Sequence, residues 1–391
     1  MNKRIVTIAI IVLITAVVVV FPSIYNGSHN ELVVSVPTTT YFSDGIEEYA
    51  LAKFKRENPK VTIRIVVQQD KSSPFTEVAD IYILSPQFAD VALLIQSENN
   101  LVLDNYISKD TKDNIWCIDL LRNAENQLVA IPLFIGVYMI NNSVGIEGGG
   151  ILSNTYTWRD IYNSYGKCEV LTEDSLLILT RQAEHLAFLT YEKLQSNDVL
   201  CDYLTDLKML MKTAILHDGK YIADSMRAIP LEHGILCDWR QRASANGSLY
   251  RIMPQYRQKN LTPLAIRAGV IAKSTKKAEL AVEFLESFIS LDAQMQLPTA
   301  GTVRVDLWAE INRQYVFKSD WAIENAQWWG MPISPMTFQQ YQEAIQTGFV
   351  GHGSFQQTQE LSPVLWDYIS GQISLDTTIE ILTQAVIQRN E

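Results

Sequence analysis

Aromatic side chains are the residues of this sequence best suited to contact another molecule. A ring covers a flat apolar face of a bound molecule, and nearby polar groups fix the orientation of that molecule. The aromatic candidates stand in predicted loops, at strand ends or within a strand: Tyr41, Phe42, Phe88, Phe134, Tyr138, Trp239, Trp328 and Trp329. Asp44 is a polar candidate beside one of these segments, and Gln87 and Arg267 are weaker polar candidates. We predict that a binding site draws its residues from this set.

Several of these candidates also have a structural interpretation. Tyr138 stands in an apolar strand pattern, where a tyrosine is more often a core residue. Asp44 can equally cap a helix whose first turn contains Glu47. Trp328 and Trp329 would expose apolar area in a loop unless a ligand or another part of the protein covers them. Four other tryptophans are interpreted as packing residues: Trp158, Trp308, Trp321 and Trp366.

The sequence carries no motif of an enzyme or of a metal site. It has no Ser/His/Asp order, no P-loop and no GxGxxG, and its cysteines form no CxxC pair beside histidines. Glycoside hydrolysis needs two carboxyl groups, but nothing in the spacing of Glu169, Glu173 and Asp174 marks them for it. We predict no catalytic residue, no metal and no cofactor. The four cysteines stand far apart: Cys117, Cys168, Cys201 and Cys237.

The composition is that of a globular protein with two domains. The chain of 391 residues is too long for one ordinary core, and 47% hydrophobic with 19% charged residues excludes disorder. The formal net charge of −11 repels phosphate backbones, and no run of Lys and Arg offsets it. Nucleic acid is therefore not an expected partner.

The N-terminal segment is predicted to enter a membrane. Lys3 and Arg4 precede an uncharged apolar run over residues 5–21, so the basic head should stay inside the cell. The run exceeds the core of a signal peptide, about 7–15 residues, and reaches the lower limit for a spanning helix, about 17 residues. No small-residue cleavage site follows it, which favours an uncleaved anchor over a cleaved signal. Residues after the tether at 26–30 would face outward, where disulfides are permitted; small buried thiols are the other interpretation of the cysteines.

The first half of the chain has the pattern of an α/β unit. Residues 32–36 and 61–67 read as strands on either side of a helical pattern, and residues 81–84 read as a third strand. Strands in this order should pair in parallel. Ligands of such open sheets bind beyond the carboxyl ends of the strands. The loops at 38–42 and 85–88 are therefore the predicted place of the site.

The rest of the chain continues to alternate strands and helices. The predicted elements are two strands within 127–141, a mostly helical region from Thr157 to about Leu216, a strand at 268–272, an amphipathic helix from Lys276 and a last helix from about Ser374. The expected fold class is therefore α/β throughout.

Four stretches carry a resemblance to a known family. They are YALAKFKRENPKVTIRIV (49–66), NQLVAIPLFIGVYMINNSVG (126–145), YTWRDIYN (156–163) and LAIRAGVIAKSTKKAELAVEFLESFISLDAQMQL (264–297). In order and spacing they resemble the family 1 extracellular solute-binding proteins of ABC importers, the group that includes maltose-type binding proteins. The likeness extends over most of residues 31–391.

The resemblance implies a two-lobe periplasmic-binding-protein-like fold of type II. In that fold two α/β lobes close around the ligand, and the chain crosses between them more than once. Residues 1–30 would be the membrane anchor and tether. Lobe 1 would comprise 31–140 and 265–310, and lobe 2 would comprise 141–264 and 311–391.

The resemblance also implies a function without catalysis. It predicts an extracytoplasmic binding protein that holds a small solute, a mono- or oligosaccharide, and delivers it to ABC permease subunits. A membrane-anchored sensor of the same fold, signalling to a membrane kinase, is the alternative. A secreted carbohydrate-active enzyme is the third interpretation, and the absence of a marked carboxyl pair disfavours it.

The sequence departs from the family pattern at three places. The usual lipoprotein cysteine is absent, so anchoring would depend on the apolar segment. The glycine-rich element after the third strand is missing around Ser85, and the lobe 2 stretch retains only Gly219, Lys220 and Trp239 of the usual wording. The last two segments would line the site, so these departures bear on which ligand is bound.

Overall fold

The computed structural model describes most of the chain after residue 30. The described residues are 31–37, 41–42, 45–68, 78–84, 95, 97–137, 139–141, 156–168, 170–193, 196–217, 231–232, 250–251, 253–257, 259–295, 302–307, 342–351 and 355–390. The predicted anchor and tether at 1–30 lie outside this part. Within it, no helix combines the length and the apolar character that crossing a membrane requires.

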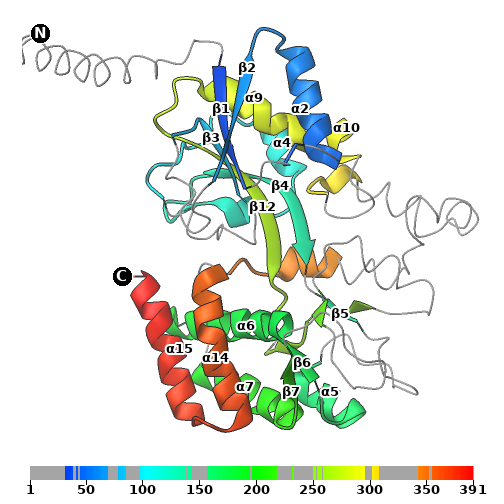
Figure 1. Cartoon of the computed structure of the whole chain (residues 1–391), viewed down its shortest axis with the longest axis vertical. Coiled ribbons are helices and arrows are strands. Elements are labelled where there is room, and N and C mark those ends of the chain that lie inside the picture. Colours follow the sequence, from blue (N-terminus) through cyan, green and yellow to red (C-terminus); the bar gives the residue numbers. More distant parts are fainter. Residues whose placement is uncertain are drawn as a thin grey trace, which may run out of the picture.

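A five-stranded mixed sheet forms the centre of the first half of the molecule (Figure 1). Its strands are β1 (Glu31–Val36), β2 (Thr62–Val67), β3 (Ile81–Leu84), β4 (Ala130–Val137) and β12 (Leu264–Ile271), in the order β2-β1-β3-β12-β4. β1 pairs in parallel with β2 and β3, as predicted, whereas β12 runs antiparallel to both β3 and β4. The carboxyl ends of β1, β2, β3 and β4 therefore point to one edge of the sheet.

Helices α2 (Gly45–Glu57) and α9 (Ala278–Ile289) pack on this sheet, and α10 (Leu291–Gln294) follows them. Ile46, Ala50 and Phe54 recur at four-residue spacing, so they share one face of α2 and are buried together. The ring of Phe54 meets that of Phe284 on α9 edge to face, with centroids 5.1 Å apart. This apolar contact fixes the two helices side by side over the sheet.

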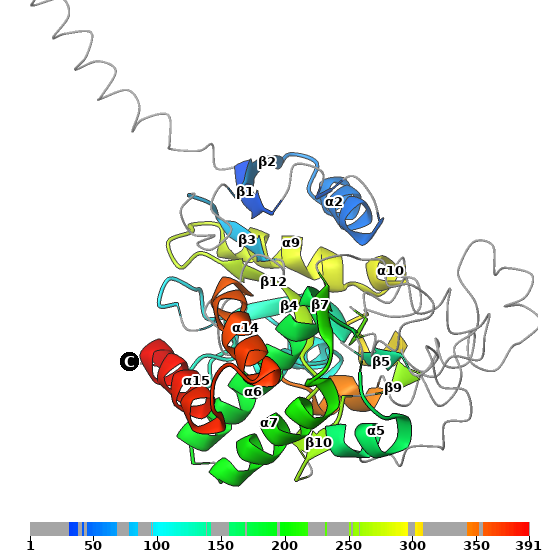
Figure 2. The same cartoon turned by 60° about the horizontal axis from the view of Figure 1, so that its bottom comes forward.

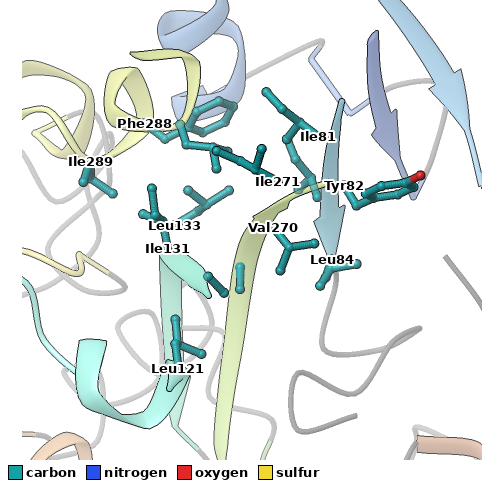
Figure 3. Close-up of a cluster of buried hydrophobic side chains, with 14 of the residues drawn as sticks. Ile81, Tyr82, Leu84, Leu121, Ile131, Leu133, Val270, Ile271, Phe288 and Ile289 are labelled. Atoms are coloured by element: carbon teal, nitrogen blue, oxygen red, sulfur yellow. The ribbon is translucent and has the colours of Figure 1, made fainter. Parts of the chain in front are cut away.

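The sheet and its helices share one hydrophobic core. Figure 3 shows Tyr82 on β3, Ile131 on β4, Val270 on β12 and Phe288 on α9 within the same cluster of buried side chains. The connection from β3 to β4 contains α4 (Lys109–Asp113), which buries none of its residues, and a 3-10 helix, η2 (Ile118–Leu121), whose Ile118 and Leu121 belong to this core. β1, β4 and β12 are remote from one another in sequence, so the core depends on the crossing of the chain rather than on local contacts alone.

The second half of the molecule is mainly helical (Figure 2). Its helices are α5 (Trp158–Tyr165), α6 (Glu173–Tyr191), α7 (Asn197–Met211), α14 (Phe355–Ser370) and α15 (Leu375–Asn390). Small sheets accompany them: β6 (Val170–Thr172) with β7 (Ile215–His217); β8 (Leu231–Glu232), β5 (Met139–Asn141) and β9 (Tyr250–Arg251); and β10 (Gln255–Tyr256) with β11 (Lys259–Asn260). The predicted helix start at Thr157 is confirmed, because Thr157 and Asp160 form a reciprocal capping box.

Buried side chains form two separate hydrophobic clusters. One contains the large sheet with α2 and α9, and the other contains α5, α6, α7, α14 and α15. Trp158 is fully buried in the second cluster, which confirms its predicted packing role. Ala344 and Ile345 pack with the first cluster, although the predicted division placed them in lobe 2. These two residues therefore give the segment before α14 a contact with the first cluster.

The chain segments before β12 and before α14 meet between the two clusters. Phe349 donates its amide to Thr262 O (3.0 Å), and Leu264 donates its amide to Phe349 O (2.8 Å). The Phe349 ring stacks on His185 of α6, with centroids 3.9 Å apart and an interplanar angle of 6°. We call residues 260–264 and 347–351 the junction, because they join the two clusters.

Candidate functional site

The structure describes three of the residues that the sequence predicted for the site, namely Tyr41, Phe42 and Phe134. The other predicted site residues lie outside the described part of the chain: Asp44, Gln87, Phe88, Tyr138, Trp239, Trp328 and Trp329. Their roles remain predictions. Tyr41 and Phe134 lie against Arg267, one of the two weaker polar candidates, and Phe42 lies against Tyr41.

The strand register places Arg267 at the carboxyl edge of the large sheet. Ala268 pairs with Leu84, the last residue of β3, so Arg267 lies one residue beyond the end of that strand. Arg267 itself pairs with Phe134, three residues before the carboxyl end of β4. The chain leaves this edge toward the second cluster, because β4 is followed by β5 and β12 is preceded by the junction. The sheet edge is therefore where ligands of open α/β sheets bind.

A β-bulge accompanies the position of Arg267. The pairing of β12 with β4 shifts between Arg267 and Ala268, so that Leu133 is an additional residue on β4. Pro132 stands next to the shift and cannot donate a hydrogen bond to the ladder, which is why prolines inside sheets occur at such irregularities. Bulges bend and twist a strand and thereby redirect its side chains.

Arg267 pairs with Glu47 in the first turn of α2. The guanidinium Nη1 donates to the Glu47 carboxylate. The Arg267 side chain is 30% exposed and that of Glu47 is 12% exposed, so the pair is partly desolvated yet accessible. Charges at such depth are screened less than surface charges.

Two aromatic rings flank the guanidinium. Its carbon Cζ lies 5.4 Å from the Tyr41 ring centroid and 5.6 Å from the Phe134 ring centroid, within the range of cation–π attraction. The rings and Glu47 come from three different elements: the segment after β1, β4 and α2. Together they restrict the guanidinium to one orientation.

Tyr41 presents a neutral phenol at this position. Burial raises the pKa of Tyr41 well above its usual value of 10.0, and the positive charge of Arg267 opposes part of this rise. The phenol therefore stays protonated at physiological pH. Its oxygen is buried beside the Arg267 guanidinium.

Phe42 has the contacts of a core residue. Its ring lies 6.2 Å from Phe284 and 6.3 Å from Phe288, measured between centroids. It also meets Tyr41 edge to face at 5.0 Å. Phe42 thus packs between Tyr41 and α9 and holds Tyr41 in place. Its contact with a ligand stays a prediction.

Sequence reasoning did not assign Glu47 to the site. It appeared only as a partner of a helix cap, because its pairing with Arg267 spans 220 residues. One signal was available: an arginine inside the apolar strand LAIRAGVI needs a partner when the strand is buried. That signal indicates that a partner exists without saying which acid it is.

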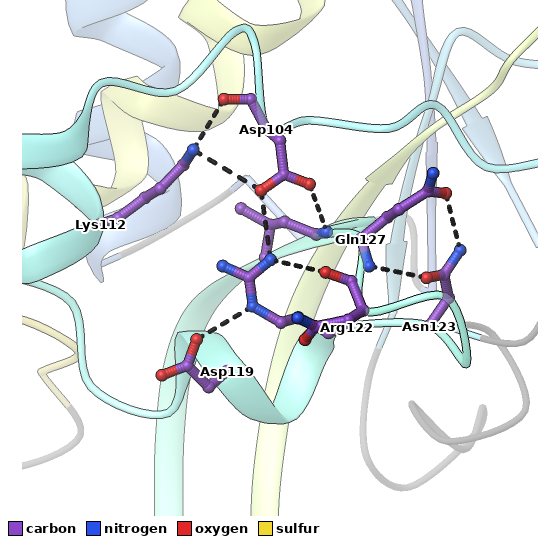
Figure 4. A network of polar contacts seen from close by, with 8 residues as sticks. Asp104, Lys112, Asp119, Arg122, Asn123 and Gln127 are labelled. Carbon is purple, nitrogen blue, oxygen red and sulfur yellow. Dashed lines mark hydrogen bonds and ion pairs between the residues drawn. The ribbon is translucent and has the colours of Figure 1, made fainter.

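A second polar network is structural. Asp104 accepts hydrogen bonds from the Leu128 amide (2.8 Å) and from Arg122 Nη1 (3.1 Å), while Lys112 Nζ donates to the carbonyl of Asp104 (2.7 Å) (Figure 4). Asn123 and Gln127 close the adjacent turn. These groups are hydrogen-bonded to one another, so the network stabilises the segment that leads into β4. Among the described residues no group of histidine, cysteine and acidic side chains has the arrangement of a metal site.

Comparison with known proteins identifies the fold. No family model matches the sequence, and no curated protein matches it either. Solved structures match over almost their whole length. The chain has the fold of the periplasmic and other ABC solute-binding proteins.

Three similar structures illustrate the match. A cyclic alpha-maltosyl-1,6-maltose binding protein from Arthrobacter globiformis has a TM-score of 0.54 at 13% identity, covering 92% of this chain and 98% of its own. An ABC substrate-binding protein from Listeria monocytogenes, in complex with cycloalternan, has a TM-score of 0.52 at 11% identity with the same coverage. An ABC transporter solute-binding protein from Thermotoga lettingae, bound with alpha-D-tagatose, has a TM-score of 0.57 at 13% identity and covers 93% of this chain and 100% of its own. These structures are of binding proteins, and at such identities the likeness concerns the fold.

Proposed function

We propose that this protein is the extracytoplasmic solute-binding component of an ABC importer, that it binds a carbohydrate between two lobes, and that it delivers the carbohydrate to permease subunits. The observation that carries the proposal is the Arg267–Glu47 pair between the rings of Tyr41 and Phe134, at the sheet edge that faces the second cluster. Two of the similar structures contain a bound sugar, and a third is named as a sugar-binding protein, which supports the choice of ligand class.

The chemistry of the site suits a sugar. A sugar ring offers flat faces of C–H groups and a rim of hydroxyls, so it needs aromatic surface together with charged donors and acceptors. Tyr41 and Phe134 supply rings, Arg267 supplies donors and Glu47 supplies an acceptor. The predicted site residues outside the described part would complete the binding surface, with Trp239, Trp328 and Trp329 as candidates from the second lobe.

The proposed place of action is the outer face of the cell membrane. Residues 5–21 form the uncharged apolar run after Lys3 and Arg4, and we propose that they anchor the protein. The two-lobe part would then stand beside the permease on a short tether.

A thermal-shift screen of the purified protein tests the ligand class. The panel contains mono- and oligosaccharides, with amino acids, peptides and polyamines as controls. A ligand at a hundred times its dissociation constant adds about 2.7 kcal/mol to the free energy of unfolding, which raises the melting temperature by several degrees. We expect such a shift with a sugar. A shift with a control compound alone would contradict the carbohydrate assignment, and no shift with any compound would contradict solute binding.

A further inference from the structure

The net charge of the groups at the sheet edge indicates which ligands can bind there better than the presence of an arginine alone. An arginine that faces a binding site without an acid attracts carboxylates and phosphates, because its guanidinium donates two parallel hydrogen bonds to them. Arg267 is different, since Glu47 already occupies one of its terminal nitrogens. The pair as a whole carries no net charge.

From this balance we infer that the Arg267–Glu47 pair restricts the site to uncharged, hydroxyl-rich ligands and rejects acidic sugars; the inference rests on the carbohydrate-binding function proposed above. A hydroxyl group both donates and accepts a hydrogen bond. It can therefore accept from Arg267 and donate to Glu47 at the same time. A carboxylate on the ligand can only accept hydrogen bonds. It could accept from Arg267, but it would then lie close to the negative charge of Glu47, which repels it.

The surroundings of the pair strengthen this discrimination. The rings of Tyr41 and Phe134 contact the guanidinium. If Arg267 moved away from Glu47 to bind a carboxylate, it would lose both of these contacts. Glu47 is the less exposed partner, at 12% against 30%, which keeps its charge poorly screened. The formal net charge of −11 adds repulsion of anions over the whole molecule.

Glu47→Gln is the decisive variant. It keeps the size of the side chain and one acceptor oxygen, replaces the other oxygen with an NH2 donor, and removes the charge that neutralises Arg267. Arg267→Met removes the donors and keeps much of the apolar stem. Glu57→Gln is the matched control: it removes the same charge from the other end of the same helix, where Glu57 pairs with Lys53 at 2.9 Å.

The probes are maltotetraose, cellotetraose and cycloalternan, each in neutral form and in a C6-oxidised form whose primary hydroxyls have become carboxylates. Calorimetric titration gives the dissociation constant of each form for the full-length wild type and the three variants. Thermal unfolding of each variant without sugar shows whether it is folded. The quantity compared is the ratio of the two dissociation constants, in which losses common to both forms cancel.

For the wild type we expect at least tenfold tighter binding of the neutral form. Glu47→Gln should shift this ratio at least tenfold toward the oxidised form, Arg267→Met should weaken both forms, and Glu57→Gln should leave the ratio within twofold of the wild type. A wild type that binds both forms equally, or an unchanged ratio in folded Glu47→Gln, would overturn the inference while the proposed function stands. A wild type that binds no probe in either form, and no sugar in the screen above, would overturn the function and the inference together.

Discussion

At the scale of single residues, one buried ion pair connects helices of the second cluster. Glu184 on α6 accepts a hydrogen bond from Arg389 Nη1 at 2.8 Å, and the two side chains are only 2% and 8% exposed. Thr358 Oγ1 donates to the other carboxylate oxygen, also at 2.8 Å. These contacts join α6 to α14 and α15, so the carboxylate of Glu184 holds three helices together.

We predict that Glu184→Ala destabilises the protein strongly, because it leaves the Arg389 charge buried without its acid. Losing one partner of a buried pair costs about 3–5 kcal/mol, to be measured as the loss in the free energy of unfolding in urea. The control is Arg64→Met, whose exposed pair with Glu31 spans 3.5 Å; an exposed pair contributes about 0–1 kcal/mol. Equal losses in the two variants would show that the Glu184 network does not support the second cluster.

Asp104 gives a residue-scale prediction about pH. Partial burial raises the pKa of this carboxyl, but hydrogen bonds from the Leu128 amide and Arg122 outweigh that effect, and the net pKa lies below its usual value of 3.8. A lowered native pKa contributes stability above the unfolded-state pKa and loses it as the pH falls through the native value. Asp104→Asn should therefore be less stable than the wild type at pH 7, and the difference should shrink below pH of about 4. A difference that is independent of pH would contradict this role.

At the scale of elements, local patterns predicted the first α/β unit well. The expected strands at 61–67 and 81–84 and the helix between β1 and β2 are confirmed within a residue or two. The register of β12 was not predictable in this way. Its first residues pair with β4, more than a hundred positions away, so the strand begins at Leu264 instead of the predicted 268.

Two further elements departed from the sequence pattern. The region from Thr157 to about Leu216, predicted as mostly helical, is divided by β6 between α5 and α6, because β6 is stabilised by parallel pairing with the distant β7. α14 was not among the predicted helices, since Pro363 stands inside it. Proline discourages a helix locally, and tertiary packing of Leu361 and Leu365 into the second cluster overrides that preference here.

The junction offers a prediction about an element contact. A Cβ atom at Gly348 would lie 2.5 Å from Ala344 O, 2.8 Å from Thr262 O and 2.8 Å from Leu264 Cδ2. Two of these neighbours are backbone atoms that cannot rotate away, so Gly348→Ala should lower the free energy of unfolding by about 1–3 kcal/mol. At Gly269 the added Cβ meets only atoms of the Leu285 side chain, so Gly269→Ala should cost less stability in the Leu285→Ala background than in the wild type. Wild-type stability of Gly348→Ala in urea unfolding would show that the junction is loosely packed.

At the scale of the whole molecule, two hydrophobic clusters are joined by β4–β5, by the entry to β12 and by residues 347–351. The two-part organisation was expected from the resemblance to a known family. Local patterns alone do not reveal it, because it depends on the order of elements along the whole chain. The sequence did not predict that Ala344 and Ile345 return to the first cluster. The candidate site was predictable only in part. The position of Tyr41 in a loop after a strand indicated that residue, but the Arg267–Glu47 pair depends on a contact that spans 220 residues and leaves no local pattern.

The proposed mechanism is a shift of population between open and closed arrangements of the two lobes. The open form would exchange the sugar, and contacts from both lobes would stabilise the closed form that docks on the permease. Arg267 and Glu47 belong to the first lobe in this scheme, and the predicted tryptophans belong to the second. Sugar binding should therefore be lost in variants of either side.

Small-angle X-ray scattering of the protein with and without an oligosaccharide from the screen tests this proposal most directly. If the sugar binds between the lobes, the radius of gyration should fall on saturation, and Arg267→Met should abolish that fall at the same sugar concentration. An oligosaccharide that binds with full occupancy and leaves the radius of gyration unchanged would contradict binding by closure of two lobes.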